Sequence, residues 1–160
     1  MFGKTTLLRD LISKISNGVE KLNFKGINVG LVDERGEIAS SYRGVPQNDV
    51  GIRTDVLNNI PKEIGMRMLI RSMAPNVIAA DEIGNKSEIE EIKYALCSGV
   101  KGIFTAHGES LEEISINPNL KELLNIHIFE RIVFLTDKKE KCELKEIYKL
   151  NKKTLEYNLI

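Results

Sequence analysis

The stretch Val77-Ile78-Ala79-Ala80-Asp81-Glu82 decides the fold class of this 160-residue chain. Its apolar residues predict a short strand buried within a sheet, because Pro75 ends the helical pattern that precedes it. Two carboxylates follow at once, at the C-terminal end of the strand. Ligands of open α/β sheets bind beyond the carboxyl ends of the strands. The stretch therefore predicts an α/β fold and puts Asp81 and Glu82 at the sheet edge where such folds bind their ligands.

Helices and strands alternate outward from this strand in both directions. Apolar spacing predicts helices over about 5–22, 62–73, 87–97 and 110–125, and strands over about 27–33, 76–80, 100–105, 128–136 and 143–148. The segment 34–51 is polar and rich in turn residues, which predicts a long loop of the kind that often carries function. The alternation indicates a mainly parallel sheet with helices on both faces. We expect one domain over residues 1–150 and a C-terminal tail over 151–160.

The charges of the chain balance, with 23 Lys and Arg residues against 23 Asp and Glu residues. This balance, together with the lack of an aromatic and basic stripe, argues against a nucleic-acid-binding protein. No stretch approaches the roughly 20 apolar residues that cross a bilayer, and the N-terminal residues lack the apolar core of a signal peptide. Cys97 and Cys142 show no metal-binding spacing, so we expect inert thiols in a reducing compartment. The composition thus predicts a cytoplasmic protein.

Residues Gly3-Lys4-Thr5-Thr6 match the second half of the phosphate-binding loop G-x-x-x-x-G-K-[ST]. In such a loop the lysine contacts the β- and γ-phosphates, and the hydroxyl of the next residue contacts Mg²⁺. The helix expected after the motif would add the positive end of its dipole to the same anion. A solvated helix start is the alternative, because the motif is short and the first glycine and preceding strand of a complete loop are not in this chain. The motif indicates a phosphate site only in combination with others.

The two acids after strand 76–80 supply what a phosphate loop needs. Asp81 is a candidate ligand of Mg²⁺, held directly or through water, since this ion prefers oxygen ligands. Glu82 is a candidate general base that polarises the attacking water. An acidic turn after a buried strand is the alternative, and it is the better interpretation of these two residues alone. The Gly3–Thr6 motif upstream reverses that preference.

Two further strands are expected to end in functional groups. Strand 27–33 ends in an acid, and Glu34 and Glu37 follow it. Strand 100–105 is followed by His107, whose imidazole can sense or stabilise a γ-phosphate. Because three strands of one expected sheet end in acids or a histidine, their side chains are predicted to meet at one sheet edge.

The polar segment after strand 27–33 contains two arginines, Arg43 and Arg53. A guanidinium group suits the charge of a phosphoryl group in transfer, and it can act within one subunit or from a neighbouring subunit. Surface salt bridging is the alternative for each arginine. Arg43 and Arg53 are therefore candidates for the positive charge at the γ-phosphate.

Together these motifs resemble the stage III sporulation protein AA family of endospore-forming bacteria. The resemblance follows the chain in order to about Lys149 and includes long strings such as Tyr42–Arg53 and Asp81–Gly84. That family is similar to the secretion ATPases of type II and type IV systems, which contain four nucleotide-site motifs. By this resemblance Walker A is Gly3–Thr6, the Asp box is Asp33–Glu37, Walker B is Asp81–Glu82 and the His box is His107.

The resemblance implies a RecA-like P-loop NTPase core that binds ATP with Mg²⁺ and hydrolyses the ATP. It also implies a homo-oligomer, a hexameric ring, at the cytoplasmic face of a membrane-embedded sporulation channel. The ring would power or gate transport between mother cell and forespore, with no nucleic acid as partner. The residues implied are Gly3, Lys4, Thr5 and Thr6 for nucleotide binding, Thr5 and Asp81 for Mg²⁺, and Glu82, Glu34, Glu37, His107, Arg43 and Arg53 for catalysis.

The family also has an N-terminal domain and a complete phosphate loop, whose first half and preceding strand are not in this chain. That strand is expected between the strand ending at Thr105 and the strand ending near Thr136. We therefore expect this chain to be a fragment, with an unpaired strand edge on each side of the gap. An interaction module without catalysis is the alternative function, and an ATPase directed at nucleic acid is a weaker one.

Overall fold

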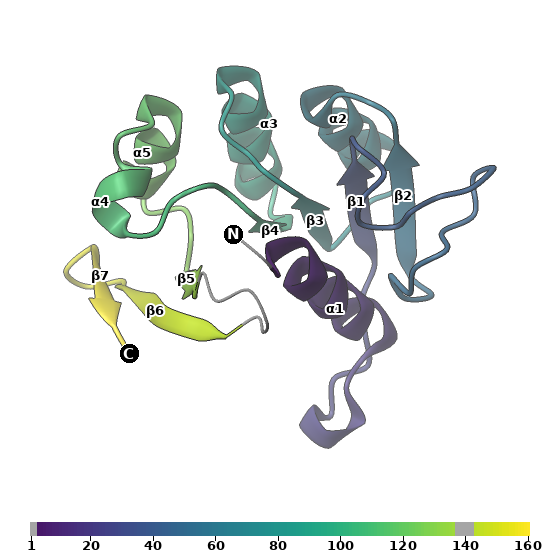
Figure 1. Cartoon of the computed structure of the whole chain (residues 1–160), viewed down its shortest axis with the longest axis horizontal. Helices are drawn as coiled ribbons and strands as arrows, with labels where there is room; N and C mark the ends of the chain where they lie inside the picture. Colours follow the sequence, from purple (N-terminus) through teal and green to yellow (C-terminus); the bar gives the residue numbers. More distant parts are fainter. Residues whose placement is uncertain (1–2, 137–142) are drawn as a thin grey trace.

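The structure is a computed structural model that describes residues 3–136 and 143–160. It contains a four-stranded parallel sheet and a three-stranded antiparallel sheet (Figure 1). The helices are α1 (Lys4–Asn17), the 3₁₀ helix η1 (Glu20–Leu22), α2 (Lys62–Ser72), α3 (Lys86–Cys97), α4 (Leu111–Ile114) and α5 (Pro118–Asn125). The strands are β1 (Val29–Asp33), β2 (Thr54–Asn58), β3 (Val77–Ala80), β4 (Lys101–Phe104), β5 (Arg131–Leu135), β6 (Leu144–Asn151) and β7 (Glu156–Leu159).

The parallel sheet has the strand order β2-β1-β3-β4. Leu31 in β1 pairs with Val56 of β2 on one side and with Ala79 of β3 on the other. Ala80 of β3 pairs in turn with Phe104 of β4. Because all four strands run in the same direction, their carboxyl ends lie along one edge of the sheet. The predicted α/β class with a parallel sheet is confirmed.

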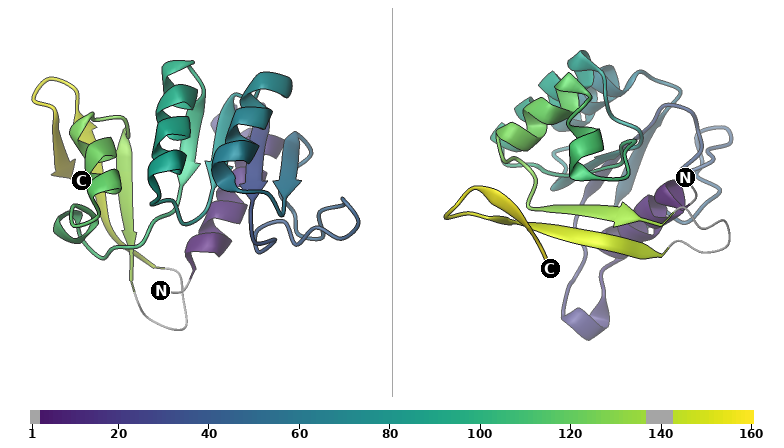
Figure 2. Two further views of the ribbon diagram at one scale, coloured as in Figure 1. Left: turned by 90° about the horizontal axis from the view of Figure 1, so that it is seen from above. Right: turned by 60° about the vertical axis from the view of Figure 1, so that its left-hand side comes forward.

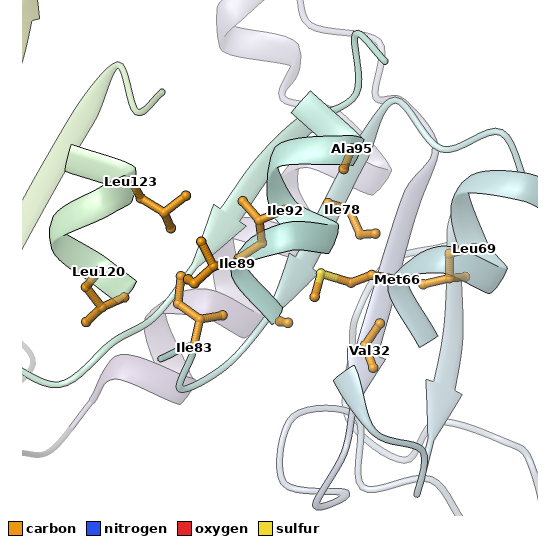
Figure 3. Packing of buried hydrophobic residues seen from close by; sticks show 11 residues of the cluster. Val32, Met66, Leu69, Ile78, Ile83, Ile89, Ile92, Ala95, Leu120 and Leu123 are labelled. Carbon is orange, nitrogen blue, oxygen red and sulfur yellow. The ribbon is translucent and has the colours of Figure 1, made fainter. Parts of the chain in front are cut away.

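Helices cover both faces of this sheet, as predicted. Figures 1 and 2 show α1 on one face and α2 and α3 on the other. Leu31 points toward α1 and packs in a cluster with Ile12. The next residue, Val32, points the other way and packs with Met66 of α2, while Ile92 of α3 and Leu123 of α5 extend the same cluster (Figure 3). This alternation makes β1 apolar on both faces, which is typical of a central parallel strand.

The antiparallel sheet has the order β5-β6-β7 and forms no ladder with the parallel sheet in the described part of the chain. A pocket of about 770 Å³ separates β4 from β5, and every residue of both strands lines it. Side chains alternate between the two faces of a strand, so a lining of consecutive residues means that the strand edges face the pocket. β4 and β5 are the two strands between which a further strand is expected from the family resemblance.

Two helix ends differ from the prediction. Gly18 ends α1 earlier than expected, because it takes a φ of 93° and its N–H donates to the carbonyl of Lys14. α3 begins at Lys86, one residue before the predicted start, because Asn85 caps it and forms a capping box with Glu88. The two differences therefore come from local capping.

Two strands were not predicted. β2 lies at the edge of the parallel sheet and contains one exposed and four half-buried residues, so its sequence lacks an apolar run. β7 pairs with β6 and lies within the segment expected to be a tail. Edge strands have a weak apolar pattern in the sequence, because one side of each such strand stays in contact with water.

Two further predictions from the sequence concern the cysteines and possible membrane spans. Cys97 is a free, exposed thiol at the end of α3, and Cys142 lies outside the described residues. Among the helices of residues 3–136 and 143–160, none has the length and apolar character needed to cross a bilayer.

Candidate active site

The candidate site lies at the carboxyl edge of the parallel sheet, where the start of α1 meets the turn after β4. Gly3 caps α1 with a φ of 98°, and Lys4, Thr5 and Thr6 form the first turn of the helix. The Nζ atom of Lys4 donates to the carbonyl of Ala106 at 2.8 Å and lies 3.5 Å from Nδ1 of His107. Lys4 and His107 are 103 residues apart in the sequence. The two predicted motifs to which they belong are therefore in direct contact in the structure.

The turn after β1 is held in place at both ends. The Asp33 carboxylate is fully buried and accepts hydrogen bonds from the backbone N–H groups of Ile38, at 3.2 Å, and Ala39, at 2.8 Å. From α1, the guanidinium of Arg9 donates to two backbone carbonyls of the same turn. Asp33 therefore shapes the turn, and the side chains between its ends are presented from a fixed backbone.

Glu82 is held by contacts from two different turns. Its backbone has a φ of 46°, a left-handed conformation that costs a residue with a Cβ atom on the order of 1 kcal/mol. Its N–H donates to Oγ1 of Thr105 at 2.8 Å. Its Oε1 atom lies 3.3 Å from Nε2 of His107, and its Oε2 atom accepts a hydrogen bond from Arg35. Residues after β1 and β4 thus hold this carboxylate between them.

The charges at this edge influence one another. Burial alone raises the pKa of Glu82, but the hydrogen bond and charge of Arg35, with the charges of His107 and Lys4, outweigh burial and leave the pKa below its ordinary value. Burial lowers the pKa of Lys4, and the charges of Glu82 and Asp81 oppose this only in part. The edge therefore joins an ionised carboxylate to a partly desolvated lysine.

A buried ion pair supports the site from the side of α2. The ammonium of Lys62 lies 2.9 Å from a carboxylate oxygen of Glu34 and 3.2 Å from one of Glu88. The side chains of Lys62 and Glu88 are only 7% and 3% exposed. Glu88 also accepts hydrogen bonds from the N–H groups of Gly84 and Asn85. Lys62 thus links α2, the start of α3 and the turn after β1.

Asp81 has the environment that best suits a cation. The residue is 1% exposed, and its Oδ1 atom has no hydrogen-bond partner among the described residues. Burial raises the pKa of its carboxyl group, and the charges of Arg35 and Lys62 offset this only partly. The described residues hold no cluster of three or more His, Cys, Asp or Glu that could bind a metal alone. The site therefore fits Mg²⁺, which binds one or two carboxylates together with water and phosphate oxygens.

We expect Asp81→Asn to raise the free energy of unfolding by about 1 kcal/mol at pH 7, because it removes a buried charge with an unpaired oxygen. Because the pKa of Asp81 is raised in the folded protein, ionisation of Asp81 destabilises the fold. This destabilisation is absent below the ordinary pKa of 3.8 and complete above the folded-state pKa. The stability difference between the variant and the wild type should therefore disappear as the pH falls through that window. Urea unfolding at several pH values measures it, and a variant that is less stable at pH 7 would contradict this account.

Arg43 and Arg53 make their contacts away from Lys4, Glu82 and His107. The loop between β1 and β2 projects beyond β2 (Figure 1), and Arg43 is exposed there, with its guanidinium 5.3 Å from the centroid of the Tyr42 ring. The Arg53 guanidinium donates to the carbonyl of Ser16 in α1 at 3.0 Å. Arg53 thus anchors the loop to α1, and Arg43 lies exposed on the loop beside Tyr42.

Sequence patterns assigned no role to Arg35, Lys62 or Thr105, all of which contact the predicted site residues. Arg35 is the one cation in the string Asp33–Glu37, and a cation among acids at a strand end is a signal that could have been used. Lys62 bonds to an acid 28 residues away, and no spacing rule identifies such a pair. Lys4, Glu82 and His107 were predicted to meet at one sheet edge, and their contacts in the structure agree with that prediction.

The sequence matches the family model described as sporulation stage III, protein AA, over residues 1–155. The chain belongs to this family. It is 43% identical over 146 residues to stage III sporulation protein AA of Bacillus subtilis (strain 168), a match that covers 91% of this chain and 47% of that protein. It is 30% identical over 125 residues to the uncharacterized protein ycf45 of Porphyra purpurea, covering 76% of this chain and 21% of that protein. The family member described here thus spans less than half the length of these relatives.

Solved structures of two ATPases, one of them from a type IV secretion system, share its fold. The ATPase DotB of Legionella pneumophila superimposes with a TM-score of 0.64 over 94% of this chain and 43% of its own, at 16% identity. The VirB11 ATPase of the Brucella suis type IV secretion system gives a TM-score of 0.59 over 92% of this chain and 45% of its own, at 14% identity. The predicted resemblance to the sporulation family and the predicted secretion-ATPase fold are both confirmed.

Proposed function

We propose that this chain is the ATP-binding and ATP-hydrolysing core of a sporulation ATPase. The observation that carries the proposal is the row of contacts from Lys4 through His107 and Glu82 to Arg35, with Asp81 beside it. These contacts bring together the four motifs predicted from the sequence, as a nucleotide site at the carboxyl edge of a parallel sheet requires. The fold shared with secretion ATPases supports the same function.

In the proposed reaction, Lys4 and the first turn of α1 bind the phosphates. Lys4 must then exchange the Ala106 carbonyl and His107 for phosphate oxygens, which form stronger, charge-assisted hydrogen bonds with its ammonium. The N–H groups at the start of α1 favour the same anion. Thr5 and Asp81 hold Mg²⁺, which when bound supplies positive charge to the phosphate oxygens.

The remaining residues act on the water and on the γ-phosphate. Glu82 accepts a proton from the attacking water, and its lowered pKa keeps it ionised at neutral pH, as a base requires. His107, with Glu34 and Glu37, adjusts the charge around the γ-phosphate. Arg43 serves from a neighbouring subunit, since it faces outward on this one, and Arg53 serves only after leaving Ser16.

We further propose that the protein works as a homo-oligomer, a hexameric ring at the cytoplasmic face of a membrane. There it powers or gates a transport channel between mother cell and forespore. Membership of the sporulation family supports the setting, and the fold shared with secretion ATPases supports the coupling of ATP hydrolysis to transport.

Nucleotide binding tests the proposed function through Lys4→Ala. We expect the affinity for a fluorescent ATP analogue with Mg²⁺ to fall about 10- to 100-fold, because a charge-assisted phosphate contact contributes roughly 1.5–3 kcal/mol. Lys14→Ala is the matched control, since Lys14 lies on the same helix but pairs at the surface with Asp10. Equal affinities for the two variants would contradict the role of Lys4. A folded wild-type chain that binds no nucleotide would instead favour an interaction module.

A further inference from the structure

Arg35 occupies the carboxylates that the proposed reaction needs, although no phosphate or metal role was predicted for it. Its Nη2 atom donates to Oε2 of Glu82 and lies 3.9 Å from Oδ2 of Asp81. Its Nε atom lies 3.9 Å from a carboxylate oxygen of Glu37. One guanidinium group therefore faces acids from two different turns, those after β1 and β3. These turns are neighbours because Val32 pairs with Ala80.

The backbone around Arg35 fixes where its side chain can reach. Gly36 takes a φ of 70°, and its N–H donates to the carbonyl of Asp33, so a tight turn surrounds Arg35. The buried Asp33 carboxylate and the guanidinium of Arg9 hold that turn from both sides. The Arg35 side chain itself is 46% exposed, so it can leave the acids without moving the core.

Both oxygens of the Glu82 carboxylate face cationic or hydrogen-bonding partners in this arrangement. Oε2 accepts from Arg35, and Oε1 faces His107 at 3.3 Å. A carboxylate that is occupied in this way is a poor acceptor for a proton from water. Asp81 differs, because its Oδ2 atom faces Arg35 whereas its buried Oδ1 atom has no partner among the described residues. A divalent cation on Asp81 would repel the nearby guanidinium.

We infer that Arg35 is a positioning residue that holds Glu82 and Asp81 while the site lacks a divalent cation and releases them when the cation binds. This inference rests on the proposed function, because it assigns a step to the same site. Arg35 and the cation compete for Asp81, and Glu82 is freed when Arg35 moves away. Removing the guanidinium should therefore favour cation binding, although Arg35 touches no phosphate in this account.

Binding of Mn²⁺ alone, followed by electron paramagnetic resonance of the free ion, tests the inference without nucleotide. We expect Arg35→Gln to bind Mn²⁺ about fivefold more tightly than the wild type, because loss of a partly exposed ion pair removes a modest competing interaction. Arg35→Lys should stay close to the wild type, since it keeps the competing charge. Arg67→Gln is the matched control, because Arg67 pairs with Glu91 away from the sheet edge.

Two outcomes would overturn the inference. Equal or weaker Mn²⁺ binding by folded Arg35→Gln would show that Arg35 does not compete with the cation. A gain in affinity that survives in Arg35→Gln/Asp81→Asn would show that the cation binds elsewhere. In the wild type, the Nε–H resonance of Arg35 should shift on addition of Mg²⁺, a result that needs no variant. Failure of the chain to bind ATP would reject the proposed function. The Mn²⁺ measurements would still show whether Arg35 competes with a cation for Asp81, because they use no nucleotide.

Discussion

Glu82→Gln is expected to lower the rate of ATP hydrolysis about 10²- to 10⁴-fold, the range by which a positioned general base accelerates a proton transfer. The amide keeps the shape of the side chain and can still contact Arg35 and His107, so the fold and the nucleotide affinity should change little. The Glu82 carboxylate lies between His107 and Arg35, and the backbone N–H of Glu82 donates to Thr105. Phosphate release at saturating ATP and Mg²⁺ measures the effect.

The control for this prediction is Glu90→Gln, which neutralises an exposed acid that pairs with Lys93 on α3. It should retain the wild-type rate. The affinity of Glu82→Gln for the ATP analogue separates loss of chemistry from loss of binding. Equal turnover by Glu82→Gln and wild type would remove Glu82 from the reaction.

Lys62→Met is expected to lower the free energy of unfolding by about 3 kcal/mol, because loss of one partner of a buried pair leaves an uncompensated charge. Lys62 faces Glu88, whose side chain is 3% exposed, and half-buried Glu34. Burial alone lowers the pKa of Lys62, but the bonds and charges of Glu34 and Glu88 outweigh it, so the net pKa is raised. The pair therefore contributes fully below the ordinary value of 10.5 and is lost only as the pH rises through the raised value.

Urea unfolding at pH 7 measures the effect of Lys62→Met. Lys93→Met is the matched control, because Lys93 pairs with exposed Glu90 and Glu122 and should cost less than about 1 kcal/mol. The double variant Lys62→Met/Glu88→Gln should recover part of the loss, since it also removes the buried charge. A cost for Lys62→Met no larger than that of the control would contradict a structural role for the ion pair.

The strands that carry the site could be predicted because they are buried on both faces. β3 and β1 consist of apolar residues from end to end, apart from the acid that ends β1, and such runs are typical of central parallel strands. The residues that follow them, Asp81, Glu82 and Glu34, then had to lie at one edge, whatever the order of the strands. The position of these acids at one sheet edge could therefore be predicted from the parallel topology alone.

The contacts within the site could not be predicted in the same way. The hydrogen bond between Arg35 and Glu82 joins residues 47 apart, and its formation depends on which strands are neighbours. β2 has one exposed and four half-buried residues, so it left no clear apolar pattern. For Arg43 and Arg53, residue type suggested a role at the γ-phosphate, but it could not predict the contacts that the structure gives them, with the Tyr42 ring and with the carbonyl of Ser16.

The most direct test of the account is to map where Mg²⁺ and a non-hydrolysable ATP analogue bind, using backbone amide resonances of the ¹⁵N-labelled chain. We expect shifts at Gly3–Thr6, in the turn Asp33–Glu37, at Asp81–Glu82 and around His107, because these segments meet at one sheet edge. The resonances of β7, which pairs with β6 at the far edge of the antiparallel sheet, should stay in place. Shifts confined to β5, β6 and β7, or saturating nucleotide without any shift at these four segments, would contradict the assignment of this edge as the nucleotide site.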